Sequence, residues 1–157
     1  MIKYLIYSIS IAFISWIVGM LINALLMKTE FYNKKLSNIN FVKSERLNKR
    51  MGLGIFKWIV KNTFFKFFNQ KLKINKKIEI SDLNYLQNEM TISEISHLVG
   101  FGFVTIFAVI KIINSDYLFA LIIMIVNILM NLYPSLLQQE NKRRIDKLRK
   151  ELGNIVA

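Results

Sequence analysis

The sequence has no cysteine, one proline and one histidine among its 157 residues. Without cysteine the chain can form no disulfide and has no thiolate nucleophile or cysteine-ligated metal site. With His97 as the only histidine, a zinc site would need carboxylates for most of its ligands, so we expect no metal. These absences leave His97 as the only imidazole for any chemistry.

Acidic residues are also scarce. The chain has 22 Lys and Arg against 10 Asp and Glu, a net charge of +12, while 54% of its residues are hydrophobic. A soluble domain of this length rarely has the interior to bury so much apolar surface, so we expect an integral membrane protein. In that setting contact with anionic lipid explains the positive charge better than nucleic acid does, and we predict no nucleic-acid partner.

The apolar residues gather in three segments, of which the first covers residues 4–27 and carries no charge. It would form a helix about 36 Å long, enough to cross a bilayer core of about 30 Å. A secretory signal peptide has a shorter apolar stretch and a small-residue cleavage site, which is missing after this segment. We therefore expect an uncleaved membrane anchor.

Residues 28–96 form a basic section with 14 Lys and Arg against 6 Asp and Glu. Within it, residues 53–68 mix aromatic side chains with three lysines, which make a deep membrane crossing costly. This pattern predicts an amphipathic helix that lies in the membrane interface. In residues 71–80 charged and apolar positions partly alternate, which fits either a short strand or an irregular basic loop.

Two further apolar segments, residues 97–113 and 117–137, are joined by a polar turn at residues 114–116. So short a connection predicts an antiparallel helical hairpin. The basic tail, residues 138–157, is typical of a helix that continues the last segment. The predicted fold class is an all-α integral membrane protein, a single membrane domain with three transmembrane helices plus an interfacial amphipathic helix.

The distribution of charge predicts an orientation in the membrane. Lysine and arginine gather on the cytoplasmic side of membrane proteins, so the basic section and the basic tail should both face the cytoplasm, in contact with the anionic leaflet. Three membrane crossings satisfy this arrangement with the N-terminus outside and the C-terminus in the cytoplasm.

The last apolar segment carries polar residues that lipid does not favour. On a uniform helix of about 100° per residue, Asn127, Asn131, Pro134, Gln138 and Asn141 fall within about 80° of arc. One interpretation is packing, in which asparagines hydrogen-bond neighbouring helices and one of them satisfies the carbonyl freed by Pro134. The other is a polar site, because buried polar groups in a membrane are costly.

Glu94 and His97 open the second segment and share one helix face, because they are three residues apart. Thr91-x-x-Glu94 matches a capping box, in which Glu94 would only start the helix. Alternatively, the carboxylate orients the imidazole and raises its basicity, as a general base requires. The hairpin would bring this pair to the depth of the polar end of the third segment, an arrangement expected of a small active site at the membrane surface.

These residues carry a resemblance to a known family. Glu94-x-x-His97, followed by an N…P-x-x-x-Q-x-x-N-x-x-R pattern, resembles the glycosyl-4,4'-diaponeurosporenoate acyltransferases, small bacterial membrane proteins of the carotenoid pathway, over residues 94–148. The resemblance implies transfer of a fatty acyl group to a sugar hydroxyl of a carotenoid glycolipid, with acyl-CoA or acyl carrier protein as the donor and no cofactor. The matching positions are Glu94, His97, Asn131, Pro134, Gln138, Asn141 and Arg144.

The leading hypothesis is therefore an acyltransferase that acts on a lipid-soluble acceptor at the cytoplasmic face of a bacterial cell membrane. His97 would take the proton of the attacking hydroxyl, and Glu94 would hold the other imidazole nitrogen. The remaining matched residues would bind substrate: the amides would orient the acceptor or stabilise an oxyanion, and Arg144 would hold donor phosphates. Two other functions stay open, a non-enzymatic accessory subunit that docks its polar stripe onto a larger membrane protein, and a membrane hydrolase.

Overall fold

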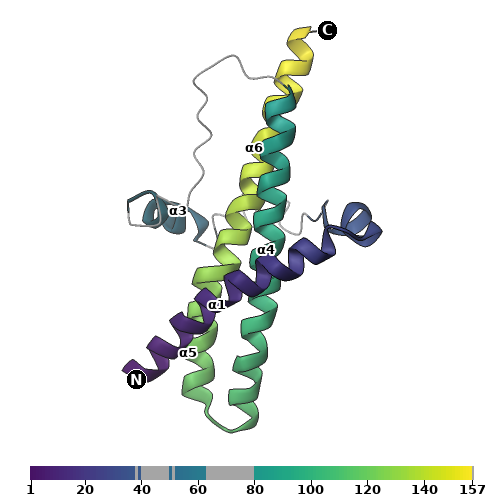
Figure 1. Ribbon diagram of the computed structural model, residues 1–157. Helices are drawn as coiled ribbons and strands as arrows, with labels where there is room; N and C mark the ends of the chain where they lie inside the picture. The colour runs from purple at the N-terminus through teal and green to yellow at the C-terminus, as the bar shows by residue number, and fades with distance from the viewer. Residues whose placement is uncertain (38, 40–49, 51, 63–79, 157) are drawn as a thin grey trace. The chain divides into compact units, whose positions relative to one another are not determined.

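The computed structural model describes residues 1–37, 39, 50, 52–62 and 80–156. All regular structure in these ranges is helical, which confirms the predicted all-α class. Residues 71–79 lie outside the described residues, so the choice between strand and loop stays open there, while Ile80 is already helical. In chain order the elements are α1 (Ile2–Leu26), η1 (Tyr32–Leu36), α3 (Leu53–Asn62), α4 (Ile80–Ile113), α5 (Tyr117–Asn127), η3 (Ile128–Leu132) and α6 (Tyr133–Val156) (Figure 1).

Within the described part of the chain, three helical stretches are long and apolar enough to cross a membrane. They are Ile2–Leu26, Ser81–Ile113 and Tyr117–Glu151, and they confirm the predicted number of spans. The first of them, α1, buries small and polar residues and exposes apolar ones such as Phe13 and Leu21. Because a soluble helix does the opposite, this pattern fits lipid as the surrounding solvent.

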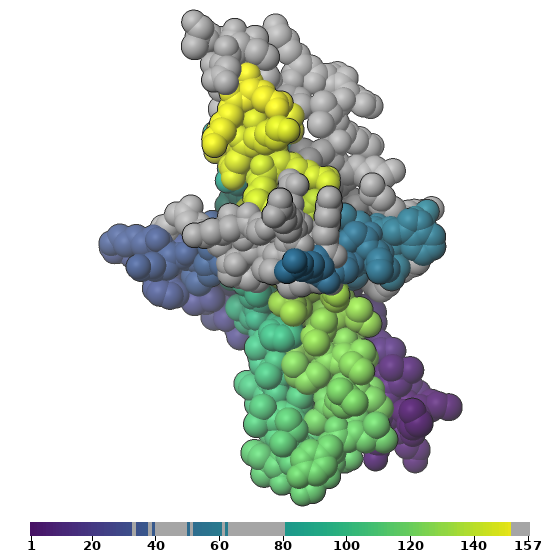
Figure 2. Space-filling view, turned by 180° about the vertical axis from the view of Figure 1, so that it is seen from behind, coloured from purple at the N-terminus to yellow at the C-terminus, as the bar shows by residue number. Residues whose placement is uncertain are grey.

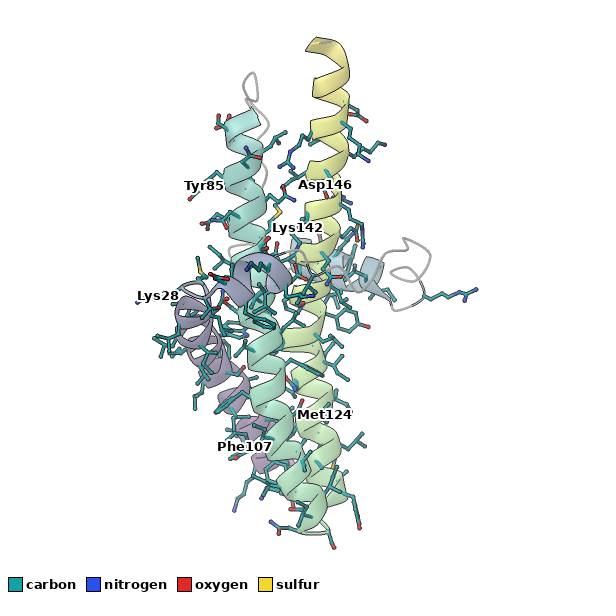
Figure 3. The ribbon with its side chains drawn as sticks, turned by 90° about the vertical axis from the view of Figure 1, so that its right-hand side faces the viewer. Lys28, Tyr85, Phe107, Met124, Lys142 and Asp146 are labelled. Atoms are coloured by element: carbon teal, nitrogen blue, oxygen red, sulfur yellow. The ribbon has the colours of Figure 1, made fainter. Side chains whose placement is uncertain are left out.

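By its contacts the chain divides into two compact units, Met1–Ile39 with Ile92–Ser135, and Asn40–Thr91 with Leu136–Ala157. In the first unit α1 lies obliquely across the hairpin of α5 and the C-terminal part of α4 (Figure 1). Figure 2 shows the two arms of this hairpin packed side by side. Their shared core consists of Ile11, Val104, Ala108, Phe119 and Ile123, with Phe107 and Met124, labelled in Figure 3, packed against it.

The turn between α4 and α5 is as tight as the sequence predicts. The backbone N–H groups of Ser115 and Asp116 donate to the carbonyls of Ile112 and Lys111, each at 2.9 Å. Ser115 adopts a left-handed conformation with φ of 61°, which lets the chain reverse within three residues. The turn places α5 antiparallel to the end of α4.

α1 approaches α4 closely at Gly19. A Cβ atom at this position would lie 2.2 Å from the backbone oxygen of Ser96. One turn further, Asn23 Nδ2 donates to the Ile92 carbonyl at 3.0 Å and to Ser96 Oγ at 3.1 Å. Small residues and amide hydrogen bonds of this kind hold helices together in bilayers, and here they fix α1 against the part of α4 that carries Glu94 and His97.

The helix that begins with α5 is interrupted before Pro134. In η3 the hydrogen bonds widen to five residues, as when the Tyr133 N–H donates to the Ile128 carbonyl. Pro134 has no N–H and its ring would clash with the Met130 carbonyl four residues earlier, so the α-helical pattern cannot continue through this point. A π-helix of this kind adds a residue to the turn, so the helical register shifts by about one residue.

The second unit is built from α3, the N-terminal part of α4 and α6 from Leu136 onward. Its core contains Leu83, Met90 and Ile145. A side-chain hydrogen bond joins Gln87 Nε2 to Asp146 Oδ1 at 3.2 Å, and an ion pair joins Lys57 of α3 to Glu140 of α6. Figure 3 labels Asp146 on α6. Of the amphipathic helix predicted over residues 53–68, α3 covers the first ten residues and the remainder lies outside the described residues.

Candidate functional site

Glu94 and His97 lie in the interior of α4. The helix begins at Ile80, so Glu94 is about four turns from its start. The Thr91 hydroxyl donates to the Gln87 carbonyl at 2.8 Å, a bond within the helix and not a cap. The capping-box interpretation is therefore wrong. The capping-box motif covers only four residues and carries no information on packing. The helix starts earlier because apolar residues such as Leu83 and Met90 pack in the second unit.

Glu94 is fully buried, with 0% of its surface exposed. A buried carboxylate in a helix of membrane-crossing length is costly and is more often functional than structural. Its charge reaches Tyr32, which follows α1 in η1. Burial first, and then the negative charge of Glu94, raise the pKa of the Tyr32 phenol above its ordinary value of 10.0, so the hydroxyl stays protonated.

The imidazole of His97 faces two side chains from other helices. Trp16 of α1 packs against it edge to face, with ring centroids 6.0 Å apart and an interplanar angle of 89°. The side chain of Asn131 also lies near the imidazole. The hydrogen bond that the sequence predicts from Glu94 to the imidazole is not formed at Nδ1, which has no hydrogen-bond partner among the described residues.

Trp16 is anchored by the interruption at Pro134. Its indole Nε1–H donates to the backbone carbonyl of Met130 at 3.1 Å. This is the carbonyl that would pair with residue 134 in a regular α-helix, and proline cannot supply the donor. The interpretation in which an asparagine satisfies the freed carbonyl is therefore wrong, because this carbonyl accepts the indole N–H of Trp16 instead.

The two asparagines of the predicted polar stripe have different surroundings, although both are fully buried. Asn127 Nδ2 donates to the Phe101 carbonyl at 3.0 Å and to Thr105 Oγ1 at 3.2 Å, which is helix packing. Asn131 Nδ2 donates to Ser15 Oγ at 3.0 Å and to Asn127 Oδ1 at 2.9 Å, while its Oδ1 makes no hydrogen bond to any described residue. Packing therefore accounts for the Asn127 side chain. For Asn131 it accounts for the N–H groups and not for the amide oxygen.

The first unit concentrates buried polar atoms that lack a hydrogen-bond partner within the described chain. Buried polar groups are nearly always paired, because an unpaired one costs about 1–3 kcal/mol. Such a concentration identifies the polar interior between α1, α4 and η3 as the candidate site. The atoms are Asn23 Oδ1, Tyr32 Oη, His97 Nδ1, Asn131 Oδ1 and Ser135 Oγ.

Sequence reasoning missed Ser15, Trp16, Tyr32 and Ser135. A signal for the first of these was present, since Ser8, Ser15 and Asn23 recur about every two turns in an otherwise apolar segment. Trp16 and Tyr32 gave no such signal, because aromatic residues are ordinary at membrane-crossing helices and their ends. Only the fold brings Trp16 to His97, Tyr32 within reach of the Glu94 charge, and Ser15 to Asn131.

Beyond η3 the buried polar positions differ from the predicted stripe. On α6 the buried positions are Ser135, Gln139 and Lys142, whereas Gln138 and Asn141 are partly exposed. The prediction assumed a uniform helix, and the π-helix shifts the register by about one residue. After Asn131 the buried polar face therefore carries Ser135, Gln139 and Lys142 in place of the predicted Gln138 and Asn141.

The other predicted substrate-binding residues belong to the second unit. Asn141 Nδ2 donates to Gln138 Oε1 at 3.4 Å, so these two side chains do meet. Arg144 is exposed and pairs with Glu140 at 3.1 Å. Since Glu94, His97, Asn131 and Pro134 belong to the first unit, convergence of the two sets stays a prediction. Across the described ranges no group of three His, Asp or Glu residues could hold a metal ion.

The family model described as glycosyl-4,4'-diaponeurosporenoate acyltransferase matches residues 28–151. The chain belongs to this family. The match confirms the resemblance and extends it from residues 94–148 to the basic section and η1, so that Tyr32, Glu94 and His97 all fall inside it. The family is one of acyltransferases in carotenoid biosynthesis. No curated protein and no solved structure matches the chain.

Proposed function

We propose that this protein transfers a fatty acyl group from an acyl-CoA or acyl-carrier-protein thioester to a hydroxyl of a lipid-soluble acceptor, such as a glycosylated carotenoid. The reaction takes place at the cytoplasmic face of a bacterial membrane. One observation carries the proposal: the only histidine of a family member lies one turn from a fully buried glutamate, in a unit where several buried polar atoms have no hydrogen-bond partner among the described residues.

His97 acts as the general base. It takes the proton of the acceptor hydroxyl while the hydroxyl oxygen attacks the thioester carbonyl carbon. The resulting tetrahedral oxyanion collapses, the carbon–sulfur bond breaks, and the imidazolium returns the proton to the leaving sulfur. The products are an ester and a free thiol, so no oxidant, reductant or metal is consumed.

Glu94 stabilises the imidazolium that forms during this step. The Cβ atoms of residues three apart on a helix lie about 5–6 Å from each other. At an effective dielectric constant of about 20, a carboxylate at that distance favours the imidazolium by roughly 3 kcal/mol, or about two powers of ten in rate. The charge therefore contributes without a direct hydrogen bond to Nδ1.

Asn131 binds the acceptor through its oxygen. Both N–H donors of its amide are used, by Ser15 and Asn127, so it has no donor left for an oxyanion. Its Oδ1 remains able to accept a hydrogen bond from a substrate hydroxyl. The oxyanion donor is instead Tyr32, whose buried hydroxyl has no partner among the described residues and stays protonated because its pKa is raised.

The basic residues of α6 serve the donor and the membrane. Arg144 is 61% exposed at its side chain and can reach a donor phosphate by exchanging its surface pair with Glu140. In this proposal the basic section and the C-terminal tail face the cytoplasm and the N-terminus faces outward. α3, which exposes Ile55 and Trp58, lies in the lipid interface.

The accessory-subunit hypothesis loses support from burial. It requires the asparagine stripe to face a larger membrane protein, yet Asn127 and Asn131 are 0% exposed and are bonded inside the first unit. The hydrolase hypothesis uses the same base with water as nucleophile. Labelled acyl donor supplied with and without acceptor separates transfer from hydrolysis.

The test is the pair His97→Ala and Glu94→Gln, with Glu89→Gln on the same helix as the matched control. We expect His97→Ala to lower formation of the acylated lipid by about 10²–10⁴-fold and Glu94→Gln by about 10²-fold. Glu89→Gln should retain product, because Glu89 is partly exposed and outside the polar interior. A tagged chain reports how much protein reaches the membrane, and wild-type product from His97→Ala membranes would refute the proposal.

A further inference from the structure

A general base must be held in one orientation, and the usual device is missing here. In a serine-protease triad a carboxylate bonds the second imidazole nitrogen. His97 Nδ1 has no partner within the described part of the chain, and Glu94 lies on the same helix without bonding it. The imidazole side chain turns about two bonds, so some other contact must fix its plane.

The indole of Trp16 provides that contact. It stands perpendicular to the imidazole, at 89°, with ring centroids 6.0 Å apart, the edge-to-face geometry that aromatic rings prefer. The indole is held in turn by its own hydrogen bond to the Met130 carbonyl, 3.1 Å long. A ring anchored at its N–H cannot rotate freely, so its contact restricts the imidazole.

This anchor exists because of Pro134. In a regular helix the Met130 carbonyl would accept the N–H of residue 134 and would not be free for α1. Proline removes that donor and leaves the carbonyl to the indole. The same interruption carries Asn131, whose side chain lies near the imidazole of His97.

From this geometry we infer that Trp16 is a positioning residue for His97, and that Pro134 acts through it by freeing the carbonyl that anchors the indole. The inference rests on the proposed role of His97 as base. Trp16 lies before residue 28, where the family match begins, so family membership does not assign it this role.

The first experiment measures turnover. Trp16→Phe keeps an aromatic ring and removes the N–H, whereas Trp16→Ala removes both. We expect Trp16→Phe to lower kcat by about 10–100-fold with the KM for the acyl donor nearly unchanged, because a misplaced base slows the chemical step and not donor binding. The matched control is Trp58→Phe, which changes the same residue type at an exposed position of α3 and should leave turnover unchanged. Wild-type kcat in Trp16→Phe would overturn the inference.

The second experiment does not depend on activity. In a Trp58→Phe background Trp16 is the only indole of the chain, so tryptophan emission and the indole Raman band sensitive to N–H hydrogen bonding report on it alone. We expect Pro134→Ala to weaken the indole hydrogen bond, because the new N–H at residue 134 competes for the Met130 carbonyl. His97→Ala should shift the emission. Spectra unchanged by both substitutions would overturn the inference.

The two experiments together separate this inference from the proposed function. If His97→Ala abolishes product and Trp16→Phe does not reduce it, the base is right and its positioning by Trp16 is wrong. If His97→Ala retains product, the proposed function fails and the inference fails with it, whatever the spectra show. Loss of product in both variants, together with the spectral changes, supports both.

Discussion

Replacing Gly19 by alanine should separate α1 from α4. The new Cβ would lie 2.2 Å from the Ser96 backbone oxygen, whereas a carbon and a carbonyl oxygen in contact are about 3.3–3.6 Å apart. The helices must therefore move apart by about 1 Å, because a backbone oxygen in mid-helix cannot rotate away. This movement also strains the two hydrogen bonds that Asn23 makes one turn further on.

The magnitude follows from three effects. Forcing an extra methyl into a packed interface costs about 1–3 kcal/mol. Weakening the Asn23 bonds adds about 0.6–2 kcal/mol, the range for such bonds in bilayers. Alanine recovers up to about 1 kcal/mol through its better helix propensity. With the alanine gain subtracted, the net loss is about 0.6–4 kcal/mol, which corresponds to a shift of roughly 3- to 900-fold in the folding equilibrium.

The assay is reversible unfolding in mixed micelles with a rising fraction of denaturing detergent, followed by tryptophan fluorescence. Gly102→Ala is the matched control, because it lies on α4 and its Cβ would meet nothing within 4 Å. We expect it to match or exceed the wild-type stability. If the unfolding free energies of Gly19→Ala and Gly102→Ala differ by less than about 0.5 kcal/mol, α1 does not cross α4 closely at Gly19.

Three further predictions address other parts of the chain. Tyr32→Phe should lower turnover by about 10²–10³-fold, the usual effect of losing an oxyanion donor, without lowering the unfolding free energy, since the Tyr32 hydroxyl has no described partner; full turnover would remove Tyr32 from the mechanism. Glu140→Gln should loosen α3, because it leaves the Lys57 ammonium, 23% exposed at its side chain, without its carboxylate. Proteolysis within residues 52–62 should become faster, and an unchanged cleavage pattern would contradict this prediction. A cytoplasm-dependent reporter should be active when fused after Ala157 and inactive when inserted at Ser115, and activity at Ser115 would reverse the proposed orientation.

Short stretches of sequence were sufficient to predict the membrane-crossing helices and the turn, because each of these features depends mainly on its own residues. An uncharged run such as residues 4–27 is stable in lipid wherever the rest of the chain lies, so length and hydropathy predict it. The turn at residues 114–116 needs only three polar residues between two apolar segments. The candidate pair was also accessible, because Glu94 and His97 are three residues apart and the chain offers no second histidine.

Tertiary structure decided the start of α4, the register beyond Asn131 and the surroundings of His97. The capping motif at Glu94 was misleading because packing of Leu83 and Met90 extends the helix upstream. The polar stripe shifted because a proline and a π-helix break the uniform period on which such reasoning depends. The bonds from Trp16 to Met130 and from Asn131 to Ser15 join residues more than 110 positions apart. Periodicity reports only neighbours within a few turns, so contacts at that separation exist only once the helices have packed.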